Sequence, residues 1–382
     1  MASTTTTPLR SGPPAVLASL QDWKLIGSKS RYAELYSARL PTSSSTSELV
    51  AVKVSPLLTD ERRYFDDHDG DGFAWSIEEQ MKEVRVWLDI QRHLSGGGRH
   101  RPHGPPELLL LCTAPRHPVD AVANSGRWLN HRLNHHWVPR PDSPVVVVIC
   151  ELLEGDMQSW ITRRAHSPNE WLGVLLGGLI SLMPIHQLGI YHGDAHDGNL
   201  LFSTALANNP ADQPVVVAAS ETKCVVRWTI SEHDRIGNVT QTLVFYQPGD
   251  KLWRWTDFGF SKYLKMKLER SHAQLWRDVW RFCCTVLHPE VFCTLSTVQR
   301  QSLLDALNQV LIEITAQGDA SSNSNNDSDA SSMTSSTRPV DRYPPAWLML
   351  KQLHSMGVFG LDRIPDECNV LIGDFKLHVR PI

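Results

Sequence analysis

The sequence has no long hydrophobic run, no large excess of one charge and no paired cysteine spacing. Its longest unbroken apolar run, Val145–Cys150, is far too short to cross a bilayer, so we expect no membrane partner. A formal charge of −4 gives no electrostatic reason to expect nucleic acid or an anionic membrane as a partner. Seven cysteines, an odd number, indicate reduced thiols rather than a disulfide framework.

The N-terminal stretch lacks a basic start followed by an apolar segment, so we expect no secretory signal. With the cysteine content, this favours an intracellular, cytoplasmic protein. A composition of 41% hydrophobic and 20% charged residues is that of a globular chain with a sizeable core. Residues 1–20, rich in Thr, Ser and Pro, and residues 317–340, rich in Ser, Asn and Asp, are expected to be disordered.

Periodicity predicts an N-terminal part made mainly of strands and a later part made mainly of helices. Lys53 lies between two valines of a predicted strand, where the alternative is an edge-strand side chain in water. Gly189 is a good stop signal for the apolar helix before it. The predicted strands are 22–27, 31–38, 48–54, 108–112 and 145–150, with further strand-like pieces at 214–218, 224–230 and 242–246, and the predicted helices are 76–94, 170–188 and 298–315.

The most informative stretch, residues 189–201, contains His192, Gly193 and Asp194, and Asn199 follows five residues after the acid. An acid and an amide on one short loop can face one small volume, where one meets a hydroxyl and the other a metal ion. Taken alone, the pair could also be a polar turn.

Two further acidic residues lie downstream of this loop. Asp257 opens an Asp-Phe-Gly sequence directly after a predicted strand, and Asp278 lies near the start of a later helix. Asp-Phe-Gly is common by chance, and an acid at a helix start also favours the helix dipole. The order of the motifs carries more information than any one of them.

In this order the motifs resemble those of the protein-kinase-like phosphotransferases, over roughly residues 22–290. The resemblance implies an α+β, two-lobed fold, with a small antiparallel-sheet N-lobe and a mainly helical C-lobe. The His-Gly-Asp-x-His-x-x-Asn variant is similar to divergent serine/threonine kinases of large DNA viruses, which would place the protein in host cytoplasm or virion. The implied parts are an N-lobe over 21–153 with insertions 56–75 and 113–143, a C-lobe over 154–316 with insertion 203–250, and a segment 341–382 that packs on the C-lobe, as if through a final helix.

The resemblance also implies ATP and Mg²⁺ or Mn²⁺ as cofactors and assigns roles to individual residues. Asp194 would orient the hydroxyl, and Glu83, with Glu79 as the alternative, would pair with Lys53. Cys150 would stand at the back of the adenine site. The implied catalytic residues are Asp194, Lys53, His192 and His196; the nucleotide-binding residues are Gly27, Ala51, Lys53, Glu83, Glu151, Leu153, Asp156 and Leu201; the metal ligands are Asn199 and Asp257; and Asp278 would hold the loop amides.

The sequence departs from that family at several positions. In the predicted lid over the phosphates only Gly27 remains, with Lys29 and Tyr32 where glycines would be expected. Gly193 replaces an Arg that binds an activation-loop phosphate, so activation by that route is not expected. His196 replaces a Lys that steadies the γ-phosphate, which His can do when protonated or through a hydrogen bond. No Ala-Pro-Glu lies between Gly259 and Asp278, so the peptide-docking platform is short or missing.

Two other functions stay open beside a protein kinase. Aminoglycoside and choline kinases share His-Gly-Asp with a His two residues beyond the Asp, which allows a kinase acting on small hydroxyl compounds. The degenerate lid allows a pseudokinase scaffold, although Lys53, Asp194, Asn199 and Asp257 are all present.

Two further stretches suggest metal binding. Residues 67–78 match a twelve-residue calcium loop, with a solvated acidic turn as the alternative; the residues concerned are Asp67, Asp69, Asp71 and Glu78. His131, His135 and His136 lie close together in the predicted insertion, but no Cys or acidic residue has matching spacing, which favours a surface insertion.

Overall fold

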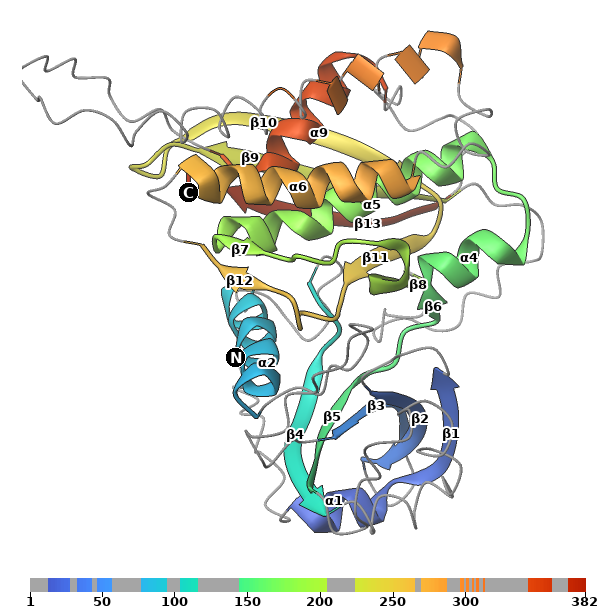
Figure 1. Cartoon of the computed structure of the whole chain (residues 1–382). Coiled ribbons are helices and arrows are strands. Elements are labelled where there is room, and N and C mark those ends of the chain that lie inside the picture. The colour runs from blue at the N-terminus through green and yellow to red at the C-terminus, as the bar shows by residue number, and fades with distance from the viewer. Residues whose placement is uncertain are drawn as a thin grey trace, which may run out of the picture. The chain divides into compact units, whose positions relative to one another are not determined.

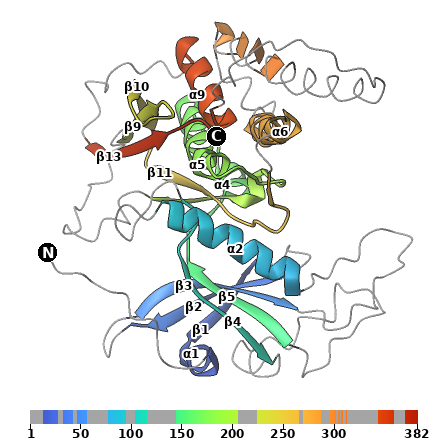
Figure 2. The same cartoon turned by 90° about the vertical axis from the view of Figure 1, so that its left-hand side faces the viewer.

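The computed structural model describes ten segments and a few positions between 296 and 312 (Figures 1 and 2). The chain divides into two compact units, one made of residues 1–85 and 106–153 and the other of residues 86–105 and 154–382. The fold is α+β, with antiparallel sheets and helices. The described segments are 13–27, 33–42, 47–56, 77–94, 104–115, 144–204, 224–264, 269–286, 343–358 and 370–382.

Several predicted features lie outside the described residues. They include Lys29 and Tyr32 of the lid, the acidic residues Asp67, Asp69 and Asp71, and the cluster His131, His135 and His136. Glu78 lies in a described helix, but its side chain is not described.

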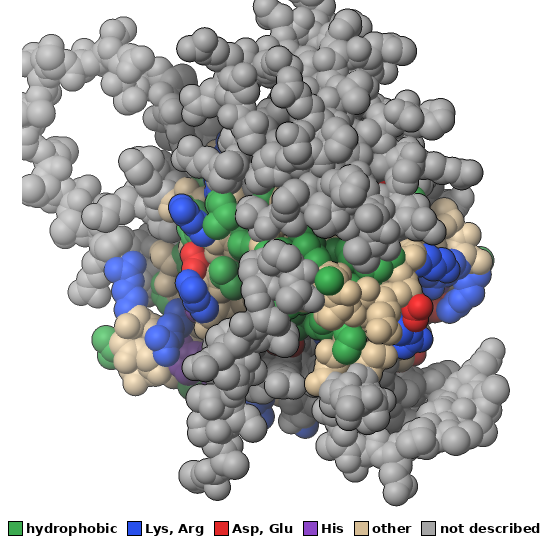
Figure 3. All heavy atoms as spheres, turned by 90° about the horizontal axis from the view of Figure 1, so that it is seen from below, with side chains coloured by type: hydrophobic (Ala, Val, Ile, Leu, Met, Phe, Trp, Pro, Cys, Tyr) green, Lys and Arg blue, Asp and Glu red, His purple; other side chains and the backbone are tan. Residues whose placement is uncertain are grey.

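The first unit holds a five-stranded sheet of order β1-β2-β3-β5-β4, in which every neighbouring pair is antiparallel. The unbroken apolar run Val145–Cys150 of β5 is buried throughout, as expected of a strand covered on both faces. On the described part of the face drawn in Figure 3, hydrophobic side chains lie among Lys and Arg side chains. The strands are β1 (Gln21–Gly27), β2 (Glu34–Pro41), β3 (Ser47–Pro56), β4 (Leu108–Pro115) and β5 (Pro144–Glu151).

Two boundaries in this unit differ from the predictions. A helix, α1 (Pro13–Ser19), lies within the stretch expected to be disordered, because Val16, Leu17 and Leu20 join the core of the sheet. The strand β4 runs to Pro115 and pairs Thr113 with Val146 of β5, so the predicted insertion does not begin at residue 113.

The helix α2 (Ile77–His93) contains the dividing line between the units, after Arg85. Its apolar residues Val84, Val86, Trp87 and Ile90 are buried, as the helical period predicts.

In the second unit, α5 (Pro168–Gln187) packs against α6 (Glu269–Val286), α9 (Pro345–Ser355) and three strands. A capping box between Ser167 and Glu170 fixes its start. Neighbours on several sides explain why this helix is apolar nearly all round. A shorter helix, α4 (Met157–Arg163), precedes it.

The second unit contains more strand than the predicted mainly helical lobe. A three-stranded sheet of order β10-β9-β13 joins β9 (Cys224–His233), β10 (Val239–Pro248) and β13 (Val370–Val379), and β13 runs parallel to β9. The predicted insertion and the C-terminal segment therefore share one sheet. The final helix expected in the C-terminal segment corresponds to α9, which packs on α5 and α6. The strand β13 was not predicted, although the alternation of Phe375, Leu377 and Val379 with polar residues was a signal for it.

Three short strand pairings complete the second unit. They use β6 (Gly155–Asp156), β7 (Ile190–Tyr191), β8 (Leu200–Thr204), β11 (Lys251–Trp255) and β12 (Lys262–Tyr263). The orders are β11-β8-β6 and β12-β7. Among the helices described, none is both long and apolar enough to span a membrane.

Candidate active site

The loop over residues 192–199 is bracketed by two antiparallel strand pairs of the second unit. Before it, β7 pairs with β12, and after it β8 pairs with β11. The register sets Trp255 opposite Leu200, and the Thr256 amide donates to the Asn199 carbonyl over 3.0 Å. Asn199, directly before β8, and Asp257, two residues after β11, therefore lie next to paired strand ends, although they are far apart in the sequence.

The buried carboxylate of Asp278, on α6, holds the start of the loop. It accepts hydrogen bonds from the amides of His192 at 2.7 Å and Gly193 at 3.0 Å. The ring Nε2 of His186 lies 3.4 Å from the same group. Because this carboxylate is only 1% exposed, these contacts replace the water it would otherwise bind.

The backbone conformation and the packing at position 193 both require glycine. Its φ is +82°, a left-handed conformation that glycine adopts without strain, and a Cβ there would lie 2.7 Å from the Phe260 carbonyl oxygen. The side chain of Ser261 donates to the His192 carbonyl at 3.0 Å, which ties the same two segments together. The structure thus gives a local reason for glycine at this position.

His192 is fully buried. Its Nε2 lies 3.1 Å from the Thr256 carbonyl, and its Nδ1 accepts from the Asp194 amide at 3.3 Å. Burial lowers the pKa of His192, which keeps the ring neutral. The ring therefore connects the loop with the strand end before Asp257, and does not reach solvent as a catalytic side chain would.

Asp194 carries the partly exposed carboxylate of the loop. Its Oδ2 accepts from Asn199 Nδ2 at 3.1 Å and lies 3.4 Å from His196 Nε2, and its Oδ1 lies 2.9 Å from an Arg281 nitrogen. Burial alone would raise the pKa of Asp194, but the hydrogen bond from His196 and the charges of His196 and Arg281 lower it. The group is ionised and can accept a proton.

His196 lies between two carboxylates. Hydrogen bonds first with Asp194 and then with Asp197 raise the pKa of His196 to about 9, so the ring is a cation at neutral pH. Its Nδ1 is within 3.3 Å of Asp197 Oδ1 and 3.0 Å of the Gly198 amide. The amide also meets Asp197 Oδ1 at 3.0 Å, so it keeps an acceptor when the ring is protonated.

Asn199 and Asp257 have the groups that a magnesium ion prefers. The amide nitrogen of Asn199 donates to the Asp194 carbonyl at 3.0 Å, so the ligating oxygen is on the other side of its side chain. Asp257 has a φ of +62° at the end of β11. In the described part of the chain, no three His, Cys, Asp or Glu side chains form a metal cluster. One carboxylate and one amide fit an ion that phosphate oxygens and water complete.

The first unit brings Lys53 and Glu83 together. The Nζ of Lys53 lies 2.8 Å from the Glu83 Oε1, and the two side chains are 21% and 8% exposed. Ala51 is buried and pairs with Cys150 of β5. Burial raises the pKa of Cys150 to about 12, which keeps the thiol protonated. The side chain of the alternative, Glu79, is not described.

The other predicted nucleotide-binding residues are divided between the units. In the first, Gly27 ends β1, Leu153 is buried, and the Glu151 amide donates to the Glu107 carbonyl at 2.8 Å. In the second, Asp156 pairs with Leu201, and its carboxylate accepts from the Ser159 amide at 2.6 Å as the cap of α4. The predicted role of Asp156 in nucleotide binding would compete with this cap.

The sequence prediction missed Arg281. Besides its contact with Asp194, its Nη1 donates to the Gly193 carbonyl at 3.3 Å. No local pattern in the sequence marks Arg281, because its partners Gly193 and Asp194 lie far earlier in the chain.

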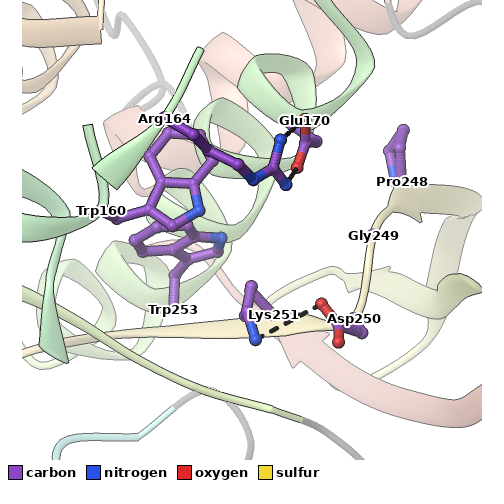
Figure 4. Close-up of a pocket in the computed structure, with 8 residues that line it drawn as sticks. All are labelled: Trp160, Arg164, Glu170, Pro248, Gly249, Asp250, Lys251 and Trp253. Atoms are coloured by element: carbon purple, nitrogen blue, oxygen red, sulfur yellow. Dashed lines mark hydrogen bonds and ion pairs between the residues drawn. The ribbon is translucent and has the colours of Figure 1, made fainter. Parts of the chain in front are cut away.

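A separate hollow of about 210 Å³ in the second unit contains none of the predicted site residues (Figure 4). Its charged groups contact one another: Arg164 pairs with Glu170, and Lys251 lies 3.6 Å from Asp250. The rings of Trp160 and Trp253 line it but are almost completely buried. The lining thus offers a ligand little unpaired charge.

In comparisons with known proteins, no family model matches the chain, and no curated protein matches it significantly.

Proposed function

We propose that the chain is an ATP-dependent phosphotransferase with a two-lobed, kinase-like fold, which transfers the γ-phosphoryl group of ATP to a serine or threonine hydroxyl of a protein. The observation that supports the proposal is that Asp194, Asn199 and Asp257 lie next to the same end of two paired strands. Asp194 and Asn199 are in direct contact, and Asp257 follows the strand that pairs with the one after Asn199. Phosphoryl transfer needs this combination of a proton acceptor and oxygen ligands within one small volume.

In the proposed reaction the hydroxyl oxygen attacks the γ-phosphorus, and the bond from that phosphorus to the β,γ-bridging oxygen breaks. The hydroxyl proton passes to Asp194, and ADP leaves with the bonding electron pair. The lowered pKa of Asp194 keeps its carboxylate ionised at the start, and Asn199 fixes one of its oxygens. Asp278 holds the loop backbone, so that much of the catalysis is positioning.

Asn199 and Asp257 would hold the magnesium ion, which neutralises charge on the phosphate oxygens when bound. His196, a cation at neutral pH, is suited to steady the γ-phosphate in place of the lysine of typical serine/threonine kinases. Lys53 would bind the α- and β-phosphates, and the ion pair with Glu83 restricts its side chain to few conformers.

A second candidate is a kinase for small hydroxyl compounds. Directly after the Asp-Phe-Gly sequence, β12 pairs with β7, and α6 begins at Glu269. This leaves few residues for a platform that would hold a peptide. Acceptor compounds therefore need to be tested beside proteins.

The test is Mg²⁺-dependent transfer from labelled ATP by the full chain, with a generic protein acceptor present and then absent. Asp194→Asn should lower turnover ~10²- to 10⁴-fold because the variant lacks the proton acceptor. Asp257→Asn should also lower turnover because it weakens a proposed metal ligand. Asn tolerates the left-handed backbone at that position. The control is Asp250→Asn, the same change at a turn outside the site, which should leave turnover intact.

Label on protein that is lost in Asp194→Asn supports the proposal. Label only on small hydroxyl compounds would favour the second candidate. Nucleotide binding without any transfer would favour a pseudokinase scaffold. Equal turnover in Asp194→Asn and Asp250→Asn would contradict the assignment of the site.

A further inference from the structure

We propose that an exposed stripe of α6, formed by Arg277, Trp280 and Arg281, docks an acidic segment of the acceptor protein. The stripe would select a hydroxyl that has carboxylates beside it in the sequence. The inference rests on the proposed function and adds the acceptor class to it.

The helix α6 (Figure 1) is amphipathic. One face packs inward through Leu275, Val279 and Phe282, which are all completely buried. Arg277, Trp280 and Arg281 lie at i, i+3 and i+4 and so share the opposite face. All three are exposed, and Trp280 keeps 37% of its surface in solvent.

One end of the stripe reaches the candidate active site. Arg281 contacts Asp194 at 2.9 Å and the Gly193 carbonyl at 3.3 Å, while its side chain stays 48% exposed. Arg277 lies one helical turn before Arg281 on the same face of α6, so the stripe leads from the contact with Asp194 along the exposed side of the helix.

The charge of the stripe indicates an anionic partner. Arg277 and Arg281 are the charged residues among the exposed side chains described on α6, and each offers several N–H donors to an anion. The carboxylate of Asp278 is buried and bound to the loop amides, so it does not neutralise them at the surface. Complementary charge steers a partner and fixes its register.

The shape of the stripe indicates a peptide. Small ligands bind in concave pockets, whereas this stripe is the outer face of a helix. Tryptophan and arginine are enriched at protein interfaces and often carry much of the binding energy. From Arg277 to Arg281 the helix rises about 6 Å. An extended peptide covers that distance in about two residues. The geometry therefore favours two acidic residues about two positions apart, one of them next to the hydroxyl.

The contact between Arg281 and Asp194 couples docking to the reaction. A carboxylate of the acceptor that pairs with Arg281 competes with Asp194 for the same guanidinium. Docking would thus release Oδ1 of Asp194 beside the incoming hydroxyl, and a neutral acceptor would not do so.

The experiment measures binding of two labelled peptides to the full chain by fluorescence anisotropy, without ATP or Mg²⁺. Both contain one serine; one has Asp or Glu beside it and two residues further, and the other has Asn or Gln at these positions. We expect the acidic peptide to bind at least ~10-fold more tightly, the ratio expected of one charge-assisted contact. Arg277→Gln should remove most of this preference, and Arg277→Glu should transfer it to a peptide that keeps the acidic residue beside the serine and has Lys two residues further.

Arg235→Gln, at an exposed turn of the same unit, is the matched control and should keep the preference. Equal affinity for both peptides, or an unchanged preference in Arg277→Gln, would overturn the inference. Because binding is measured without nucleotide, an acidic preference that depends on Arg277 supports the docking surface even if no phosphate is transferred. In that case the proposed function fails and the surface stands.

Discussion

The carbonyl oxygen of Phe260 lies 2.7 Å from the point where a side chain at Gly193 would begin. The contact joins the candidate catalytic loop to the segment after Asp257. The positive φ of Gly193 adds a second reason for glycine, since other residues rarely adopt it. Backbone packing thus limits this position to glycine, whatever its effect on regulation.

Gly193→Ala should therefore destabilise the chain. The backbone conformation alone costs ~1–2 kcal/mol for a residue with a Cβ. The contact with Phe260 should add ~1–3 kcal/mol of overpacking. Denaturant unfolding measures the loss. The control is Gly237→Ala, where φ is +93° and nothing lies within 4 Å of the added carbon. Equal losses for the two variants would contradict a specific role of the Phe260 contact.

The pKa of His196 predicts a pH dependence of stability. Because its pKa in the folded chain, about 9, exceeds the ordinary value of 6.5, protonation stabilises the folded state. This contribution is complete below pH 6.5 and is lost as the pH rises through about 9. Free energies of unfolding of the chain and of His196→Gln should therefore differ most at the acidic end of this window. NMR titration of the ring provides a direct check, and a midpoint near 6.5 would contradict the prediction.

The ion pair of Lys53 and Glu83 should show measurable coupling in unfolding experiments. With Glu83 8% exposed, the pair is shielded from water, and we expect a coupling energy of ~1–3 kcal/mol from a double-mutant cycle with Lys53→Met and Glu83→Gln. The exposed pair of Arg92 and Asp89, at 75% and 41%, serves as the reference and should give less than ~1 kcal/mol. Similar coupling in both cycles would contradict a shielded pair.

Glu232 should be important for attaching α9 to β9. Its Oε2 accepts from Trp347 Nε1 at 2.8 Å and lies 2.7 Å from Lys351 Nζ. Glu232→Ala would leave a buried indole N–H without its acceptor, at a cost of ~2 kcal/mol or more in the free energy of unfolding. Glu232→Gln keeps an acceptor and should lose less. Equal losses would indicate that packing, and not the hydrogen bonds, dominates this contact.

Much of the local structure could be predicted from the sequence. The apolar run at Val145–Cys150 and the helix expected at 170–188 correspond to β5 and α5 within a few residues. The apolar run encodes the strand, and the helical period with the capping residue Ser167 encodes the helix. Both signals come from residues that are close in the sequence. The helix α1 was missed since seven residues with two prolines give no period to detect.

The sequence by itself determined which chemical groups are present: an acid and an amide five residues apart, a lysine on a strand, and an acid after another strand. Only the tertiary structure decided that Arg281 meets Asp194, that Phe260 restricts position 193 to glycine, and that β13 pairs with β9. Such contacts join residues far apart in the chain, and they arise from packing of whole elements. No local period or spacing encodes them, so one sequence read in order does not reveal them.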